Sequence, residues 1–145
     1  MLVLSNACLV SGRTAEYITE TRQQWVEELP LNTHFKVPLF AVPNLDTSEQ
    51  EQFTRFFGRE LQKATARPCF VDLDSERETL KMAGKLIPST NYHVHSKFLQ
   101  IGQEVRIQVR ILHNETGQVL AITSAKVAGK HSDLAVRIVK ALVFQ

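Results

Sequence analysis

The chain has little of what a chemically specialised protein usually displays. Only two of its 145 residues are cysteines, Cys8 and Cys69, too few for a disulfide scaffold or a cysteine-rich zinc site. No apolar run approaches the roughly 20 residues that a transmembrane helix needs. The sequence also lacks a Gly-rich phosphate loop, a Gly-x-Ser-x-Gly elbow and a His-Glu-x-x-His helix. These absences argue against a disulfide-rich scaffold and against the enzyme classes that carry those motifs.

An excess of charge of one sign is also missing. The chain has 17 Lys and Arg against 15 Asp and Glu, a net charge of +2, which does not demand a polyanionic partner. Hydrophobic residues make up 43% of the chain, enough for one domain with its own core. We therefore expect a single folded domain without cofactors.

Residues 1–12 stand apart from this domain. The apolar run Met1 to Val10 lacks a basic beginning and is too short for a signal peptide. It reaches Cys8 through Leu4, Ser5, Asn6 and Ala7, a loose match to the residues before the lipid-bearing cysteine of a bacterial lipoprotein. A frayed terminus and an added edge strand are the alternatives. We predict a tether or signal remnant over 1–12, with Cys8 as the candidate lipidation site, and one domain over 13–145.

The first half of the chain alternates helical and strand patterns. Helical spacing predicts helices over residues 14–29, 47–64 and 75–86. Short apolar runs predict strands over 34–42 and 68–73, and Cys69 in the second is expected to be a small core residue.

Local signals refine these bounds. Capping boxes are expected at Thr47, Ser48 and Ser75, each three residues before Gln or Glu. Pro38 cannot donate to a ladder, so the strand over 34–42 is expected at an edge or with that position turned away from its neighbour.

Residues 91–127 predict a three-stranded antiparallel meander. Apolar and polar residues alternate over 92–98 and 105–111, and Gly102-Gln103 suits a tight hairpin. Residues 114–117 form the next turn, with glycine last, and a strand over 118–127 follows, with Val119, Ala121, Thr123 and Ala125 expected under helices. Ser132 is expected to cap a final amphipathic helix. The predicted fold class is α+β, with helices packed on a mixed sheet.

One face of the first hairpin is basic. Its polar positions are His93, His95, Lys97, Arg106 and Arg110. This face is the candidate partner-binding surface, for an acidic protein or, as the alternative, for nucleic acid. Aromatic side chains for stacking bases are missing from it, which makes nucleic acid the less favoured partner. The simplest interpretation of these residues is a solvated polar face without a partner.

Three smaller groups of residues each have a functional and a structural interpretation. His93 and His95 share a strand face, but two ligands do not complete a zinc site. Asp72 and Asp74 could form an acid/base pair, although helix initiation explains them equally. Asn114 begins a glycosylation sequon within a turn, where turn chemistry accounts for the same residues.

The meander segment Tyr92-His-Val-His-Ser-Lys-Phe-Leu-Gln-Ile-Gly-Gln-Glu-Val-Arg-Ile-Gln-Val-Arg-Ile-Leu, followed by Thr116-Gly-Gln-Val-Leu, resembles a bacterial envelope group. This group includes the flagellar outer-membrane protein FlgO, the TolB amino-terminal domain, the activator LpoB and CsgG-like components of the curli and Pel exporters. Ser96 stands where the group usually has glycine.

The resemblance implies a non-catalytic accessory domain of the periplasm or outer membrane, often lipid-anchored, that assembles into rings or binds a larger machine. It provides no catalytic residues. We therefore expect an envelope accessory or assembly protein that acts through protein contacts. A cytosolic nucleic-acid-binding module is the alternative.

Overall fold

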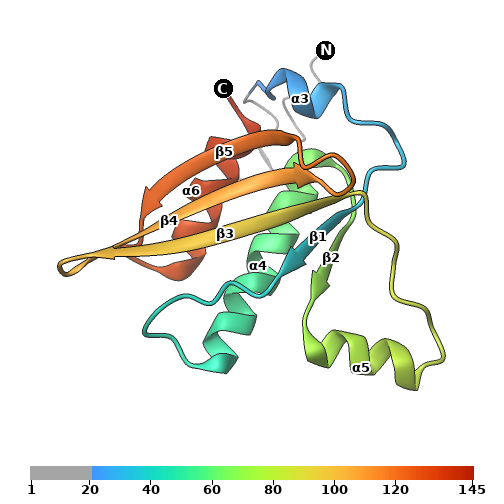
Figure 1. The fold of residues 1–145 in the computed structure, drawn as a ribbon, viewed down its shortest axis with the longest axis horizontal. Coiled ribbons are helices and arrows are strands. Elements are labelled where there is room, and N and C mark those ends of the chain that lie inside the picture. Colours follow the sequence, from blue (N-terminus) through green and yellow to red (C-terminus); the bar gives the residue numbers. More distant parts are fainter. Residues whose placement is uncertain (1–20) are drawn as a thin grey trace, which may run out of the picture.

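A computed structural model describes residues 21–145 (Figure 1). The predicted tether over 1–12 and Cys8 lie outside the described residues. The elements in chain order are α3 (Gln24–Glu27), β1 (Phe35–Pro38), α4 (Thr47–Thr65), β2 (Cys69–Asp72), α5 (Asp74–Met82), β3 (Tyr92–Ile101), β4 (Glu104–His113), β5 (Val119–Lys126) and α6 (His131–Val143).

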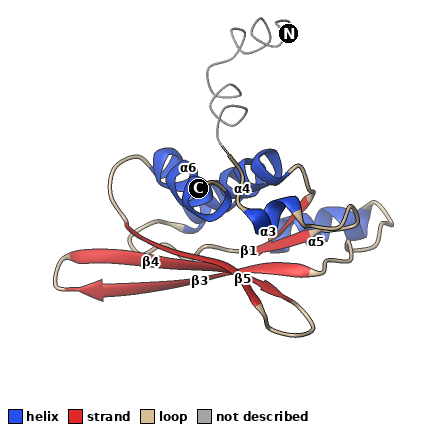
Figure 2. Cartoon of the chain, turned by 90° about the horizontal axis from the view of Figure 1, so that it is seen from above, coloured by secondary structure: helices blue, strands red, loops and turns tan. Residues whose placement is uncertain are grey.

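The five strands form one mixed sheet in the order β2-β1-β3-β4-β5. β1 runs parallel to β2 and to β3, whereas β3, β4 and β5 form the predicted antiparallel meander. Figure 2 shows the helices together on one side of the sheet, so the domain has two layers. The α+β prediction is confirmed. The opposite face of the sheet is left without a helix among the described residues.

The core lies between the sheet and the helices α4 and α6. One side of α4 is buried through Phe53, Phe57, Leu61 and Ala64, so the predicted aromatic stripe is core. The fully buried large side chains come from β1, the segment after it, α4, β3, β4 and α6: Phe35, Phe40, Phe57, Leu61, Ile107, Ile111, Leu134, Ile138, Leu142, Val37, Val42 and Val94. Burial of these side chains is the main force that holds the two layers together.

The predicted helix caps were wrong in position. Asp46, not Thr47 or Ser48, caps α4: its Oδ1 accepts from Glu49 N at 2.8 Å, and Glu49 Oε1 accepts from Asp46 N at 3.4 Å. Aspartate serves this role as well as serine or threonine, so the box begins one residue earlier. Neither α5 nor α6 has a side-chain cap, so the caps predicted at Ser75 and Ser132 are absent.

The predicted strand over 34–42 was too long, and β1 is not an edge strand. Pro38 is the last residue of β1, and pairing with β3 extends only to Lys36, so no ladder bond from residue 38 is lost. The chain then turns inward. Phe40 N donates to Thr54 Oγ1 at 2.9 Å, which ties this buried segment to α4.

The two ends of the described chain lie side by side. Arg22 forms an antiparallel bridge with Phe144, and Gln145 N donates to Thr21 O at 3.1 Å. This pairing competes with helix, so the described part of the helix predicted over 14–29 is reduced to the four residues of α3. The Trp25 indole N–H donates to Leu142 O at 2.9 Å and fixes α3 against α6.

The two hairpin turns were predicted correctly. Gly102 and Gly117 have φ of 62° and 72°, a region that glycine occupies without steric cost. The ladder is irregular at Ile111 and Leu112, however. Beyond it Val119 pairs with Leu112 and is 44% exposed, so the prediction that Val119 lies under helices was wrong.

Candidate binding face of the sheet

The side chains of the sheet that point away from the helices form what we call the open face. The register places His95 beside Arg110, Lys97 beside Gln108, and Leu99 beside Arg106. The members of the open face on β1 to β5 are Lys36, Pro38, Phe70, Asp72, His93, His95, Lys97, Leu99, Ile101, Glu104, Arg106, Gln108, Arg110, Leu112, Val119, Ile122, Ser124 and Lys126. All five residues of the predicted basic face therefore lie on it.

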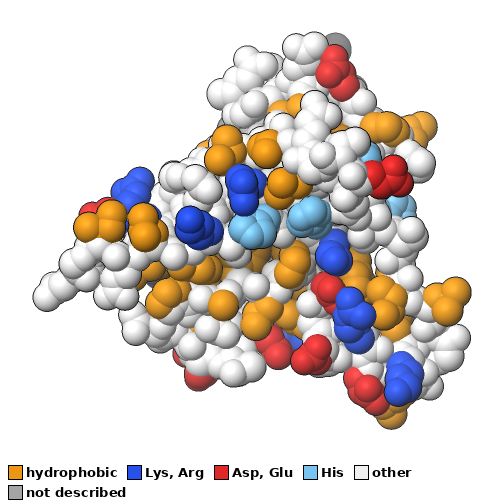
Figure 3. Space-filling model, in the orientation of Figure 1, with side chains coloured by type: hydrophobic (Ala, Val, Ile, Leu, Met, Phe, Trp, Pro, Cys, Tyr) orange, Lys and Arg blue, Asp and Glu red, His pale blue; other side chains and the backbone are white. Residues whose placement is uncertain are grey.

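Figure 3 shows this face, where Lys, Arg and His side chains gather over the meander with hydrophobic side chains among them. The hydrophobic members of the open face were not predicted from the sequence. Leu99 is 53% and Ile122 54% exposed, and Ile101 and Val119 are also exposed. A signal existed for Leu99 and Ile101, since odd-numbered residues of β3 share one face with His93.

Cations outnumber carboxylates on the meander part of the open face. Lys97, Arg106, Arg110 and Lys126 stand against one carboxylate, Glu104. β4 begins at Glu104, one residue earlier than predicted, and this brings the carboxylate onto the face. Glu104 lies 3.1 Å from Arg106 Nη1 and 3.9 Å from Lys126 Nζ. Lys97 and Arg110 make no ion pair with a described residue.

The meander part of the open face has an order along the strands. Leu99 and Ile101 lie at the hairpin end, whereas Ile122 and Val119 lie at the opposite end. Arg106 and Lys126 lie level with Leu99, Arg110 lies level with Ile122, and Lys97 lies between these two levels. A hollow of about 150 Å³ opens in this middle region, lined in part by Lys97, Leu99, Arg106, Gln108 and Ser124. Two cations, an amide and a hydroxyl around one small hollow suit an anionic group such as a carboxylate.

The two histidines each use one ring nitrogen within the protein. Arg110 Nη2 lies 3.2 Å from His95 Nδ1, and since guanidinium only donates, His95 accepts there. His93 Nδ1 lies 2.7 Å from Asn114 Oδ1, an acceptor, so His93 donates. Among residues 21–145 no three His, Cys, Asp or Glu side chains gather as a metal site requires. The geometry gives the metal hypothesis no support.

Asn114 has a structural part in this region. Besides accepting from His93, its amide nitrogen donates to Thr90 O at 2.8 Å, and its backbone N donates to Asn91 O at 3.0 Å. These bonds tie the β4–β5 turn to the segment before β3. They explain Asn114 through turn structure.

Asp72 and Asp74 do not form an acid/base pair. Asp72 forms a two-pronged ion pair with Arg77, with Arg77 Nη2 2.9 Å from Oδ2 and Arg77 Nε close to Oδ1. The hydrogen bond from Arg77 lowers the pKa of Asp72, so this carboxylate stays ionised at neutral pH. Asp74 is the first residue of α5, where its negative charge interacts favourably with the helix dipole.

The lone described cysteine is a packing residue. Cys69 packs against the hydrophobic core, and burial raises the pKa of its thiol to about 12. A protonated, buried thiol is a poor nucleophile and metal ligand. The prediction of a small core residue is confirmed in part, because Cys69 is partly buried at the margin of the core.

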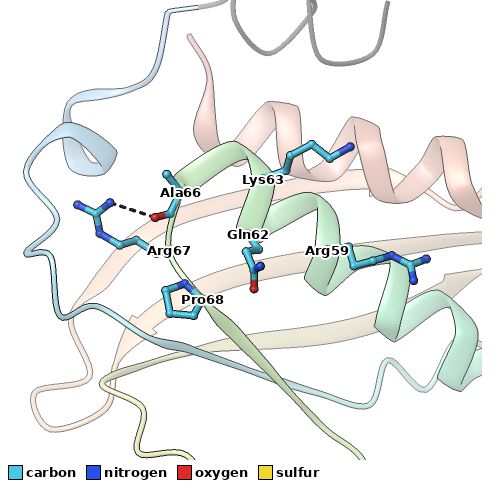
Figure 4. Close-up of a pocket in the computed structure, with 6 residues that line it drawn as sticks. All are labelled: Arg59, Gln62, Lys63, Ala66, Arg67 and Pro68. Carbon is cyan, nitrogen blue, oxygen red and sulfur yellow. Dashed lines mark hydrogen bonds between the residues drawn. The ribbon is translucent and has the colours of Figure 1, made fainter. Parts of the chain in front are cut away.

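A second basic region surrounds a pocket of about 600 Å³ at the end of α4, lined by Arg59, Gln62, Lys63, Ala66, Arg67 and Pro68. Figure 4 shows Arg59 and Arg67 pointing in opposite directions, so these cations do not converge on one ligand. The Arg67 guanidinium instead donates to Leu29 O at 2.9 Å, Pro30 O at 3.0 Å and Ala66 O at 3.2 Å. Arg67 therefore anchors the chain rather than a ligand.

Comparison with known proteins adds little. No family model and no curated protein matches the chain. Two solved structures of PelC dodecamers from Paraburkholderia phytofirmans, one of them a point variant, share 10% identity with it. They align over 77% of this chain and over 85% and 86% of theirs, with TM-scores of 0.45 and 0.42. At these scores the likeness supports no statement about function or assembly.

The structure also bears on membrane topology. None of the helices within residues 21–145 has the length and apolar content required to cross a bilayer.

Proposed function

We propose that this protein is a non-catalytic accessory module of the bacterial cell envelope that binds another protein through its open face. The observation that supports this proposal is the uncovered sheet face on which exposed Leu99 and Ile122 are interleaved with the cations Lys97, Arg106 and Arg110. The partner that fits this pattern has carboxylates and apolar side chains interleaved on its contact surface.

The apolar ends supply a reason to bind. Leu99, Ile101, Val119 and Ile122 are each 44% exposed or more, and covering them removes apolar surface from water. Exposed apolar side chains with polar neighbours are characteristic of protein-interaction surfaces. The cations contribute mainly to orientation and partner choice, because like charges on a wrong partner oppose contact.

The same face suits nucleic acid less well. Phosphates would pair with Lys97, Arg106 and Arg110, but single-stranded bases need aromatic platforms. The described open face offers one phenylalanine, Phe70, on β2 at the far edge of the sheet. Leu99 and Ile122 provide apolar contact without a ring on which a base can stack.

Envelope location is the part of the proposal that rests on sequence resemblance. The segment over 92–112 and the Thr116-Gly motif resemble the envelope group, and Cys8 is the candidate lipid attachment. Cells that carry the gene in its chromosomal context are fractionated and probed for the protein. We expect it in the periplasm or outer membrane, with Cys8→Ser reducing the membrane-bound share. A protein found wholly in the cytosol contradicts this part.

Site-specific photocrosslinking in living cells tests the binding face. A photoreactive residue is placed at Gln108 or Ser124 on the open face, and at Asp133 on α6 as the matched control. We expect protein adducts from the first two positions only. The double variant Arg106→Glu, Arg110→Glu should remove them.

The other outcomes of that experiment each overturn the proposal in a different way. Adducts that nuclease removes favour nucleic acid. Adducts of twice the protein's own mass identify a second copy of the chain, making the open face a homo-oligomer interface. Equal labelling from Gln108, Ser124 and Asp133 means that the open face has no dedicated partner.

A further inference from the structure

We infer that a second surface, at the carboxyl-terminal end of α5, contacts the headgroup region of an anionic lipid bilayer. We call it the α5 tip, and it consists of Lys81, Met82, Lys85, Leu86 and Ile87. Figure 1 shows α5 and the chain after it at an outer corner of the molecule. The tip lies on other elements than the open face and is argued independently of it.

Large apolar side chains at the α5 tip are turned into solvent. Met82 is 80% exposed, Leu86 91% and Ile87 45%, and α5 contains no buried residue. Three such side chains within six residues make a small apolar surface rather than an isolated exposed residue. The described residues leave Met82 and Leu86 almost uncovered and cover about half of Ile87.

The tip is an ordered structure. Ala83 N donates to Thr79 O at 3.1 Å, Gly84 N to Lys81 O at 3.0 Å, and Lys85 N to Leu80 O at 2.8 Å. Gly84 has a φ of 70°, so the chain reverses there as a glycine-terminated helix does. A hydrogen-bonded reversal holds Met82 and Leu86 out from the body.

The base of α5 is fastened to the domain by polar contacts. Arg55 Nε lies 3.2 Å from Glu76 Oε1, and Arg55 Nη2 lies 3.1 Å from Ser75 Oγ. The ion pair between Arg77 and Asp72 adds a link to β2. The helix is therefore anchored at its first turn, and its far end projects.

The two lysines of the tip favour an anionic lipid surface as the occupant. Residues 79–90 contain Lys81 and Lys85 and no Asp or Glu. Apolar side chains with interleaved lysines are typical of segments that lie in the headgroup region of anionic membranes. Asp74 and Glu78 line one hollow with Lys81, Lys85, Leu86 and Ile87, so two carboxylates lie beside the tip, on the side toward the base of α5.

Vesicle binding tests the inference with the full chain carrying Cys8→Ser, so that no attached lipid contributes. The protein is sedimented with vesicles of phosphatidylcholine and phosphatidylglycerol, and with vesicles of phosphatidylcholine alone. We expect binding to the anionic vesicles and at least about tenfold weaker binding by Met82→Ser, Leu86→Ser. Lys81→Gln and Lys85→Gln should each weaken it about fivefold.

Leu31 provides the matched control. It is 90% exposed, as Leu86 is, but it lies between α3 and β1 without flanking lysines. Leu31→Ser should bind vesicles as the parent does. Circular dichroism checks that every variant is folded.

Three results would overturn the inference. The first is no binding of the parent to anionic vesicles at low salt. The second is an equal effect of Leu31→Ser and of Met82→Ser, Leu86→Ser, which would indicate general hydrophobicity. In the third, the parent ignores vesicles but self-associates by light scattering, and only the tip variant is monomeric, so that the tip binds a second copy.

Discussion

Gly58 on α4 lies directly against Val71 on β2: a Cβ added at Gly58 would fall 2.6 Å from Val71 Cγ2. Real Cβ atoms do not approach other heavy atoms this closely. A hydrogen is therefore the largest group that fits at residue 58 while Val71 keeps its place. The close approach of α4 to the parallel edge of the sheet depends on this pair.

Gly58→Ala should lower the free energy of unfolding by about 1 kcal/mol. Overpacking costs about 1–3 kcal/mol, and the better helix propensity of alanine returns about 1 kcal/mol. In a Val71→Ala background the clash is absent, so Gly58→Ala should become neutral or stabilising. Urea denaturation of the four proteins measures both steps. The same cost in both backgrounds would contradict the contact.

Asp46→Ala should lower the free energy of unfolding by about 1 kcal/mol, because it removes the N-cap of α4 and its reciprocal bond with Glu49. Thr47→Ala and Ser48→Ala are the matched controls, since neither side chain caps the helix, and each should stay within about 0.5 kcal/mol of the parent. Thermal or urea unfolding decides between the three positions.

Arg67→Ala should destabilise the domain by about 1–2 kcal/mol, because its guanidinium donates to Leu29 O and Pro30 O ahead of β1. Arg59→Ala, in the same pocket, removes only a cation–π contact with Phe56 and should cost clearly less. Comparing the two urea midpoints tests this difference. Equal losses would mean that Arg67 does not anchor the segment.

Acid should weaken the fold in part through Asp72. The hydrogen bond from Arg77 lowers the pKa of this carboxyl in the folded protein below its unfolded value of about 3.9. The contribution of the pair is therefore complete above pH 3.9 and is lost as the pH falls through the folded pKa. Urea midpoints of the parent and Asp72→Asn should converge below that window. A gap that persists in acid would exclude this pair as the cause.

Periodicity in the sequence was sufficient for the local structure. The meander, its two glycine turns and the buried side of α4 follow from alternation, turn chemistry and helical spacing, which involve residues near in sequence. The prediction of the cap of α4 was less accurate, because Asp46, Thr47 and Ser48 can all cap a helix.

The candidate site was predicted only in part, for a physical reason. The basic residues of one hairpin could be found from alternation, but Lys36 and Phe70 join the open face through pairing of β1 with β2 and β3. Such pairing depends on contacts distant in sequence. The irregularity in the β4–β5 ladder at Leu112 also changes the face of the sheet on which Val119 lies. The hydrophobic pattern of the sequence does not indicate it. The α5 tip was not predicted, because the helix was predicted to continue through residue 86, beyond the turn at Gly84.

The bridge between Arg22 and Phe144 makes the path of the described chain nearly a closed ring. A short linker from Gln145 to Thr21 would complete that ring, because their backbones already share a hydrogen bond of 3.1 Å. New termini opened between Gly102 and Gln103 would then give a circular permutant of the same domain. Its opened ends would lie beside Leu99 and Ile101, so reporter groups fused there would sit at the edge of the open face.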